Sequence, residues 1–339
     1  MSQLGRPTTF YREAGSGSRN KSERICLIVN PRAGAGRAGA RLDELKQAVD
    51  RAFEQWEVRL TEGPRHATAL AAEAALSGAR IVAAVGGDGT CHEVVNGLFD
   101  GDRPRAPQVI FTTIPFGTGS DLQKTLCIPR PLHEALWIAA TGITLPSDIG
   151  HVELTTDSGT QTELFINVAG FGTNGAVVRL ANKMDKRWGG TATFFAATLR
   201  ASLDYKAAQV TVRWESPDGP GTWTGKVTSG FISNGAYCGG GMWVGKGGTM
   251  QDGHFDLTIL PEAPLPRLIL ESRRLYDGTI EKITGAVRVR ASRIDVSAPP
   301  EGEIFLDLDG ESPGKLAASF RVLPRALHVR GGWLHNPVT

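Results

Sequence analysis

The sequence predicts an α/β N-terminal domain with a parallel sheet, followed by a mostly antiparallel β-sandwich domain. Between residues 24 and about 147, apolar runs alternate with segments of helical periodicity. From about residue 148, the chain becomes a series of runs rich in Val, Thr, Ile and Phe, with turns between them. The length of 339 residues suffices for two domains, and the apolar content of 41% is typical of a globular protein.

Each element has a local reason. In the first domain the β-rich apolar runs predict strands at 25–29, 56–63, 80–85 and 108–115, and apolar residues at helical spacing predict helices at 37–56, at 65–78 and from about Cys91. In the second domain the runs at 163–172, 207–215, 223–235, 254–261, 286–299 and 303–311 predict antiparallel strands, interrupted by one helix near 189–202. We therefore expect a disordered tail at 1–22, a first domain at 23–147 and a second at 148–319, with 320–339 packing back on the first.

Composition excludes several classes of function. Lysine and arginine total 37 against 35 acidic residues, so no global positive field points to nucleic acid as a partner. The four cysteines have no paired spacing, which argues against a disulfide framework or a zinc cluster and favours a reducing, cytoplasmic location. The longest uncharged stretch, 164–178, is shorter than a membrane-spanning helix of about 20 residues.

A glycine-rich turn, "AVGGDGT", follows the strand at 80–85 and opens a helix. Such a turn points backbone N–H groups and the positive end of the helix dipole at one place, where a polyphosphate can bind closely. Asp88 lies in this turn, where a carboxylate would repel phosphate unless a cation intervened, so it is a candidate magnesium-linked group. The alternative is that Asp88 caps the helix that follows it.

Two more turns of this kind end neighbouring strands. "NPRAGAG" begins at Asn30, and "PFGTGSD" begins at Pro115. Because the carboxyl ends of parallel strands meet at one edge of a sheet, the three turns predict a nucleotide-binding crevice there.

With these motifs the chain resembles a known family. "NPRAGAG", "GGDGTCHEVVNGL", "PFGTGSD", "SDIGHVEL", "FINVAGFG", "SNGAYCGGGM", "QDGHFDL" and "LDLDGE" occur in the order found in lipid kinases with a diacylglycerol kinase catalytic domain, a group that includes sphingosine kinases and bacterial YegS-like enzymes. The likeness covers roughly residues 23–335 and implies a fold similar to diacylglycerol kinases and NAD kinases. It also implies ATP and Mg²⁺ as cofactors and transfer of the γ-phosphoryl group to a lipid hydroxyl.

The resemblance implies a set of nucleotide-binding positions. Thr61 matches a threonine before the second helix, with a helix N-cap as the alternative, and His92 stands where relatives often carry asparagine, which favours a polar contact. Cys91 is expected to be a small packing residue beside the nucleotide. The matching positions are Asn30, Pro31, Arg32, Ala33, Gly34, Thr61, Gly86, Gly87, Asp88, Gly89, Thr90, Cys91, His92, Gly117, Thr118 and Gly119.

"LDLDGE" supplies three carboxylates, Asp307, Asp309 and Glu311. Alternation along a strand would place all three on one face, where they would raise each other's pKa and suit one of them to accept a proton. The resemblance implies that the proton acceptor lies in "DGE", and the sequence does not rank Asp309 against Glu311. The alternative is a turn with exposed acidic residues.

Two further sites rest on the resemblance. Asp148 matches an aspartate between the domains that faces the lipid headgroup or the catalytic carboxylate, and the alternative is an Asx turn at the domain boundary. Asp252, with the carbonyl oxygens of Thr249 and His254, matches a loop that holds a structural magnesium ion. Gln251 replaces the first aspartate of that loop and removes one charge from the site.

A lipid substrate implies transient contact with a membrane surface and a peripheral location. Residues 187–199 offer an aromatic lining for acyl chains, or form an ordinary buried helix. A basic stretch is suited to bind anionic lipid, or is a solvated strand face. It consists of Arg267, Arg273, Arg274, Lys282, Arg288 and Arg290.

The sequence leaves alternatives to a lipid kinase. They are an NAD kinase-like enzyme and an inactive nucleotide- or lipid-binding regulator of the same fold. A homodimer is a possible assembly.

Overall fold

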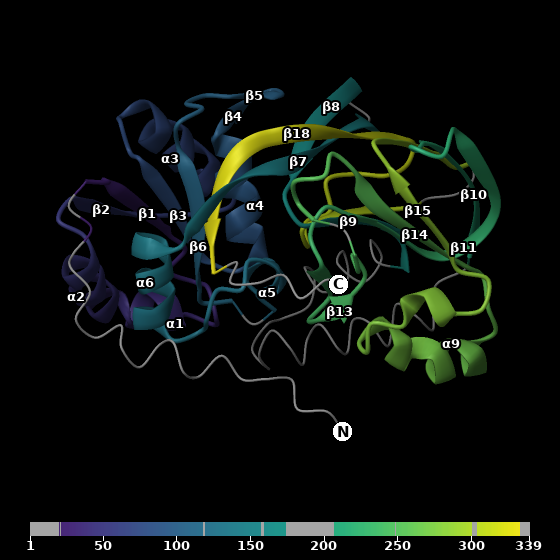
Figure 1. Ribbon diagram of the computed structural model, residues 1–339, viewed down its shortest axis with the longest axis horizontal. Coiled ribbons are helices and arrows are strands. Elements are labelled where there is room, and N and C mark those ends of the chain that lie inside the picture. Colours follow the sequence, from purple (N-terminus) through teal and green to yellow (C-terminus); the bar gives the residue numbers. More distant parts are fainter. Residues whose placement is uncertain are drawn as a thin grey trace.

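The computed structural model describes residues 20, 22–117, 119–156, 159–173, 207–247, 249–299 and 304–332. Figure 1 shows two bodies side by side, an α/β domain at the left and a β-rich domain at the right. The predicted fold class is confirmed. The expected acyl-chain segment at 187–199 and Thr118 lie outside the described residues.

The first domain is built on a parallel sheet in the order β6-β3-β1-β2. Fully buried apolar residues fill β1 and β3, as expected for strands with helices on both faces. The elements are β1 (Ile25–Val29), α1 (Arg37–Ala40), α2 (Leu42–Ala52), β2 (Trp56–Leu60), α3 (His66–Leu76), β3 (Ile81–Gly86), α4 (Asp88–Gly97), β4 (Phe99–Asp100), β5 (Arg103–Pro104), β6 (Ile110–Pro115), α5 (Asp121–Thr125) and α6 (Leu132–Thr141).

The second domain is antiparallel and has its own core, centred on Phe165, Phe171 and Phe255. The described elements are β7 (Ile143–Thr156), β8 (Gly159–Phe165), β9 (Val168–Gly172), β10 (Ala208–Glu215), β11 (Gly221–Ser233), β12 (Tyr237–Cys238), β13 (Met242–Trp243), β14 (Phe255–Pro261), α9 (Leu265–Glu271), the 3-10 helices η3 (Ser272–Leu275) and η4 (Ile280–Lys282), β15 (Val287–Ala291), β16 (Arg293–Ser297), β17 (Leu306–Leu308) and β18 (Ala318–Gly331).

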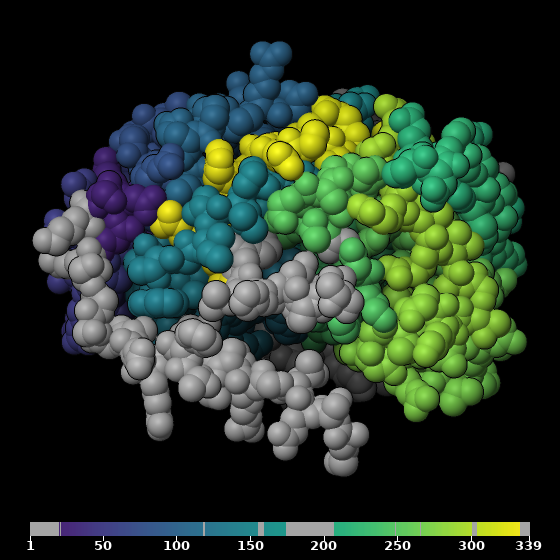
Figure 2. Space-filling model, in the orientation of Figure 1, coloured from purple at the N-terminus to yellow at the C-terminus, as the bar shows by residue number. Residues whose placement is uncertain are grey.

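Two long strands connect the domains. β18 pairs in parallel with β6 of the first domain and antiparallel with β16 of the second, while β7 pairs with β18 along nearly its whole length. Within the described residues, one 14-stranded sheet therefore runs through both domains. β18 lies at the surface across the junction (yellow in Figure 2). The expected boundary at residue 147 falls inside β7, which continues without a break on both sides of it.

The helix predicted at 37–56 differs from the structure. It is divided into α1 and α2, and α2 ends at Ala52. Phe53 takes an extended conformation with its side chain fully buried, and Trp56 begins β2 opposite Ile25. Pairing with β1 therefore overrides the helical periodicity at the end of this segment. Among the described residues, no helix combines the length and apolar character needed to cross a bilayer.

Candidate active site

The three glycine-rich turns lie together at the carboxyl ends of β1, β3 and β6, which are neighbours in the sheet. The amide of Asn30 lies 3.4 Å from the hydroxyl of Thr90. A Cβ on Gly117 would lie 2.5 Å from the Cα of Gly87, so the second and third turns touch backbone to backbone. This contact leaves no room for a side chain at Gly117 and brings the two turns together at one edge of the sheet.

Asp88 begins α4, but its carboxylate binds the next helix in space. Its two oxygens accept hydrogen bonds from the backbone N–H groups of Asp121 (3.2 Å) and Leu122 (3.1 Å) at the start of α5. Burial, followed by the charge of Asp121, raises the pKa of Asp88 to about 6, although the backbone donors oppose this shift. The alternative of a cap on its own helix is wrong, because Asp88 joins the second turn to the third.

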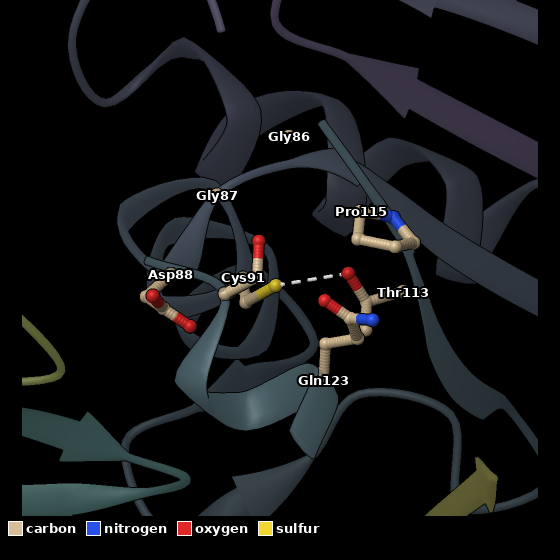
Figure 3. Close-up of a pocket in the computed structure, with 8 residues that line it drawn as sticks. Gly86, Gly87, Asp88, Cys91, Thr113, Pro115 and Gln123 are labelled. Carbon is tan, nitrogen blue, oxygen red and sulfur yellow. Dashed lines mark hydrogen bonds between the residues drawn. The ribbon is translucent and has the colours of Figure 1, made fainter. Parts of the chain in front are cut away.

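Figure 3 shows a narrow hollow beneath these turns. The thiol of Cys91 points at Thr113 and donates a hydrogen bond to its hydroxyl over 3.2 Å, and that hydroxyl donates to the carbonyl of Ala84. Cys91 is thus a buried packing residue on the inner side of α4. The hollow is lined by Gly86, Gly87, Asp88, Cys91, Thr113, Pro115, Ser120 and Gln123.

The remaining matched positions lie around the same edge of the sheet. Thr61 directly follows β2 and donates its backbone N–H to Val29. It does not cap α3, because that helix begins at His66 with Arg65 at the N-cap. Arg32 lies in the first turn and is exposed, and its N–H is held by the side chain of Asn30.

The turn at 308–311 differs from the strand that alternation predicts. β17 ends at Leu308, and Asp309 (φ 52°) and Gly310 (φ 91°) reverse the chain so that Leu308 pairs with Glu311. The prediction of three carboxylates on one strand face is therefore wrong. A tight turn with two left-handed residues sends Asp309 inward and Glu311 back toward α4.

The carboxylate of Asp309 is buried and surrounded by donors. It accepts hydrogen bonds from the backbone N–H groups of Ile166 (2.9 Å), Asn167 (2.9 Å) and Val168 (3.1 Å), and it lies 3.3 Å from Nδ1 of His92. Because these four groups already occupy both of its oxygens, the Asp309 carboxylate is poorly placed to contact a substrate hydroxyl.

Glu311 is placed differently, since it is exposed and lies at the first turn of α4. A Cβ on Gly89 would lie 2.5 Å from its Oε1. Asp307 stands beside it, half-buried, and receives the N–H of Gly310 at 2.7 Å. Burial raises the pKa of Asp307 to about 8 against that hydrogen bond, and the charges of Asp309 and Glu311 add to the rise.

His92 is buried with its ring against protein side chains. Nδ1 lies 3.3 Å from Asp309, and Nε2 lies 3.4 Å from a carboxylate oxygen of Glu163 on β8. Burial acts to lower its pKa, but the hydrogen bonds and charges of Asp309 and Glu163 prevail and raise it to about 10. Both ring nitrogens therefore face carboxylates of the protein, and a contact of His92 with the nucleotide stays a prediction.

Asp148 is fully buried on β7 and does not belong to the group of carboxylates in the 307–311 segment. Its carboxylate accepts the backbone N–H groups of Gly253 and Arg325, each at 2.7 Å, so it joins β7 to a neighbouring loop and to an irregular part of β18. Burial raises its pKa, the two backbone donors oppose this, and the charge of Asp252 adds to it.

The loop that matches a magnesium site does not fit a cation. The oxygens of Asp252 accept the backbone N–H groups of Thr249 (3.1 Å) and His254 (3.0 Å), and Oδ2 also lies 2.8 Å from the guanidinium of Arg290. Gln251 contributes an amide instead of a second charge. Across the ranges that the structure describes, no three His, Cys, Asp or Glu side chains gather as metal ligands.

Several residues of the site escaped sequence reasoning. Lys124 pairs with Asp121 at 2.7 Å and lies beside Gly241 of the "CGGGM" segment, which brings a cation to the edge of the crevice. Its spacing of three residues from Asp121 in a short helix was the available signal. No local sequence signal marks Glu163, because β8 comes close to His92 only in the folded protein.

The matches to known proteins cover both domains. Residues 24–152 match the diacylglycerol kinase catalytic domain, and residues 167–331 match the YegS C-terminal NAD kinase beta sandwich-like domain. The chain belongs to this family of lipid kinases.

Individual relatives agree with that assignment. The chain is 27% identical to a diacylglycerol kinase of Bacillus subtilis (strain 168), over 91% of this chain and 96% of that protein. It is 28% identical to a "Probable lipid kinase YegS-like" of Yersinia pestis (strain Pestoides F), over 85% and 92% of the two chains. A crystal structure of a diacylglycerol kinase from Bacillus anthracis str. Sterne shares the fold, with a TM-score of 0.66 at 21% identity over 91% and 97% of the chains.

Proposed function

We propose that the protein transfers the γ-phosphoryl group of ATP to the hydroxyl of a lipid, of diacylglycerol, sphingoid or phosphatidylglycerol type. The observation that supports this most is the position of Glu311, an exposed carboxylate beside Gly89 of the second glycine-rich turn, at the first turn of α4. Phosphoryl transfer needs a positioned polyphosphate and a base beside the acceptor hydroxyl, and this edge of the sheet offers both.

The nucleotide phosphates would bind the N–H groups of the turns at Asn30–Gly34, Gly86–Thr90 and Gly117–Gly119, with Thr61 beside them. Lys124, which pairs with Asp121, would add positive charge at the rim. Magnesium bound to the nucleotide would supply further neutralisation of phosphate charge when present.

Glu311 is the proposed proton acceptor. As the lipid oxygen forms its bond to the γ-phosphorus, the hydroxyl proton passes to the Glu311 carboxylate, the bond from phosphorus to the bridging oxygen breaks, and ADP leaves. Asp309 is assigned a supporting role, because four donors already surround it. Asp148 belongs to the framework that joins the domains.

The test uses γ-labelled ATP, magnesium and a mixed lipid extract, with extraction of label into the organic phase. The Glu311→Gln variant is expected to lose transfer, whereas Glu262→Gln, which changes an exposed glutamate paired with Lys226, is expected to keep it. Label in NADP would instead support an NAD kinase-like reaction, and ATP binding without any transfer would support a regulator.

We further propose peripheral membrane contact through α9, at the lower right in Figures 1 and 2. Ile269 and Leu270 are 66% and 76% exposed, so this helix presents apolar side chains to its surroundings. The basic stretch contributes less than its composition suggests, because Arg274 pairs with Glu271 and Arg290 with Asp252. We therefore expect burial of these apolar side chains in the lipid surface to contribute most of the membrane affinity.

A further inference from the structure

The environment of His92 is unusual for a histidine beside a nucleotide crevice. The side chain is only 7% exposed, and its two ring nitrogens face two carboxylates from other parts of the chain. Asn96, one turn further along α4, places its amide nitrogen 3.4 Å from Nε2 and also donates to the carbonyl of His92. Only a ring protonated at both nitrogens can donate to both carboxylates.

The charges around the ring favour that state. Asp309 and Glu163 together outweigh the burial penalty and raise the pKa of His92 to about 10. Arg65, on the solvent side, lies 3.4 Å from the other oxygen of Glu163, and Gln161 donates to that oxygen as well. Asp307 is a further acidic neighbour; its pKa stays raised to about 8 by burial, and the charge of His92 opposes that rise only in part.

The two partners of the ring have different origins. Glu163 lies on β8 of the second domain, and Asp309 is the first of the two left-handed residues in the 308–311 turn that carries Glu311. His92 itself belongs to α4, whose first turn contacts Glu311. The ring therefore connects the helix of the glycine-rich turn, a strand of the second domain and the 308–311 turn.

We propose that His92, as an imidazolium bonded to Asp309 and Glu163 at once, is a positioning residue that holds the 308–311 turn against α4 and so sets the place of the Glu311 carboxylate. The N–H groups of residues 166–168 anchor the Asp309 carboxylate to the second domain, and the His92 ring is the contact that joins this anchored carboxylate to α4. Glu311 follows two residues later through Gly310, and its placement depends on how Asp309 is held. The role of Glu311 in this inference rests on the proposed function.

The first test does not depend on activity. In protein labelled with ¹⁵N and ¹³C at histidine, the ring of His92 is expected to show both nitrogens protonated and to remain so up to about pH 9, because partners of this kind hold the charged form. The ring signals of the surface residue His133, whose side chain is 79% exposed, serve as the solvent-exposed reference. A His92 ring that loses one of its two protons below about pH 8 overturns the proposal.

The second test separates positioning from binding. His92→Asn keeps a polar group at the position but cannot bridge two carboxylates, and we expect kcat to fall about 10²-fold with little change in the KM for ATP. Glu163→Gln leaves the ring bonded to Asp309 alone and should cause a smaller loss, while His133→Asn should cause none. The double variant His92→Asn, Glu163→Gln should lose no more than His92→Asn.

The outcomes are distinguishable. An unchanged kcat in folded His92→Asn overturns the proposal, as does a loss confined to KM. If His92→Asn does not fold, Glu163→Gln and the ring signals of the unaltered protein decide the question. If the unaltered protein transfers no phosphate to lipid, the proposed function fails, whereas a doubly protonated His92 bonded to both carboxylates would still support the ring as the link between the domains.

Discussion

Replacement of Gly89 by alanine tests the proposed place of Glu311 with one methyl group. The new Cβ would lie 2.5 Å from Oε1 of Glu311, against an ordinary contact of 3.4 Å or more, so the carboxylate end must move by about 1 Å. The affected atom is the end of a flexible side chain. Folding should therefore cost little, and alanine in a helix can stabilise by up to about 1 kcal/mol relative to glycine.

Activity should respond in the opposite direction. A misplacement of about 1 Å at a reacting group can reduce the rate about 10²-fold, so we expect kcat for lipid phosphorylation to fall by that order while the melting temperature stays level or rises. The assay measures label transfer and ATP affinity in parallel with thermal unfolding. Gly63→Ala is the matched control, because its Cβ would meet nothing within 4 Å.

Two results would refute the reasoning. An unchanged kcat in Gly89→Ala would show that the position of Glu311 does not limit the reaction. A large loss of ATP affinity with kcat intact would show that the methyl group obstructs the nucleotide instead of the carboxylate.

Other predictions follow from the same contacts. Asp309→Ala should lower the unfolding free energy by about 3–5 kcal/mol in urea denaturation, because it strands a buried His92 charge and three N–H donors; a change below about 1 kcal/mol would contradict the account. Since the pKa of folded His92 is raised to about 10 from an ordinary 6.5, its protonation stabilises the fold fully below about pH 6.5, and this contribution is lost as the pH rises toward 10. The stability gap between the unaltered protein and His92→Asn should therefore narrow over that window, and a constant gap would exclude this linkage. Chelation with EDTA should leave the melting temperature unchanged, and a lower melting temperature in EDTA would reveal a bound cation. Arg290→Ala should lower the melting temperature by about 1–3 °C, because it removes a half-exposed ion pair with Asp252. Serine at both Ile269 and Leu270 should reduce sedimentation with phospholipid vesicles several-fold, while serine at the equally exposed Leu76 of α3 should not, and equal binding by all three proteins would exclude α9 as the contact.

The features that the sequence predicts well are those with local causes. The strand at Ile25–Val29 is a continuous buried run, and the glycines of the second and third turns mark places where backbones touch. The resemblance then predicts that these turns bind a nucleotide together. Periodicity, turn residues and motif order were therefore sufficient for the fold class and for the edge of the sheet where the candidate site lies.

The parts that were missed depend on long-range pairing. Alternation favoured a strand through Asp309, but pairing of β17 with β9 ends at Leu308, where the chain turns. Glu163 reaches His92 only through the position of β8, and no local pattern marks it. The ranking of Glu311 above Asp309 as the proton acceptor rests on their different burial, which spacing alone does not reveal.

The paired strands β7 and β18 join the two domains through a long ladder with one irregular point. Their ladder shows a register shift between Leu323 and Leu327, and there the carboxylate of Asp148 receives the N–H of Arg325. Bending between the two halves should concentrate at this shift, because the ladder is continuous on either side of it. The two domains would then move relative to each other mainly at this shift, where Asp148 bonds Gly253 and Arg325. The fit of a lipid between the domains would therefore depend on this one buried aspartate.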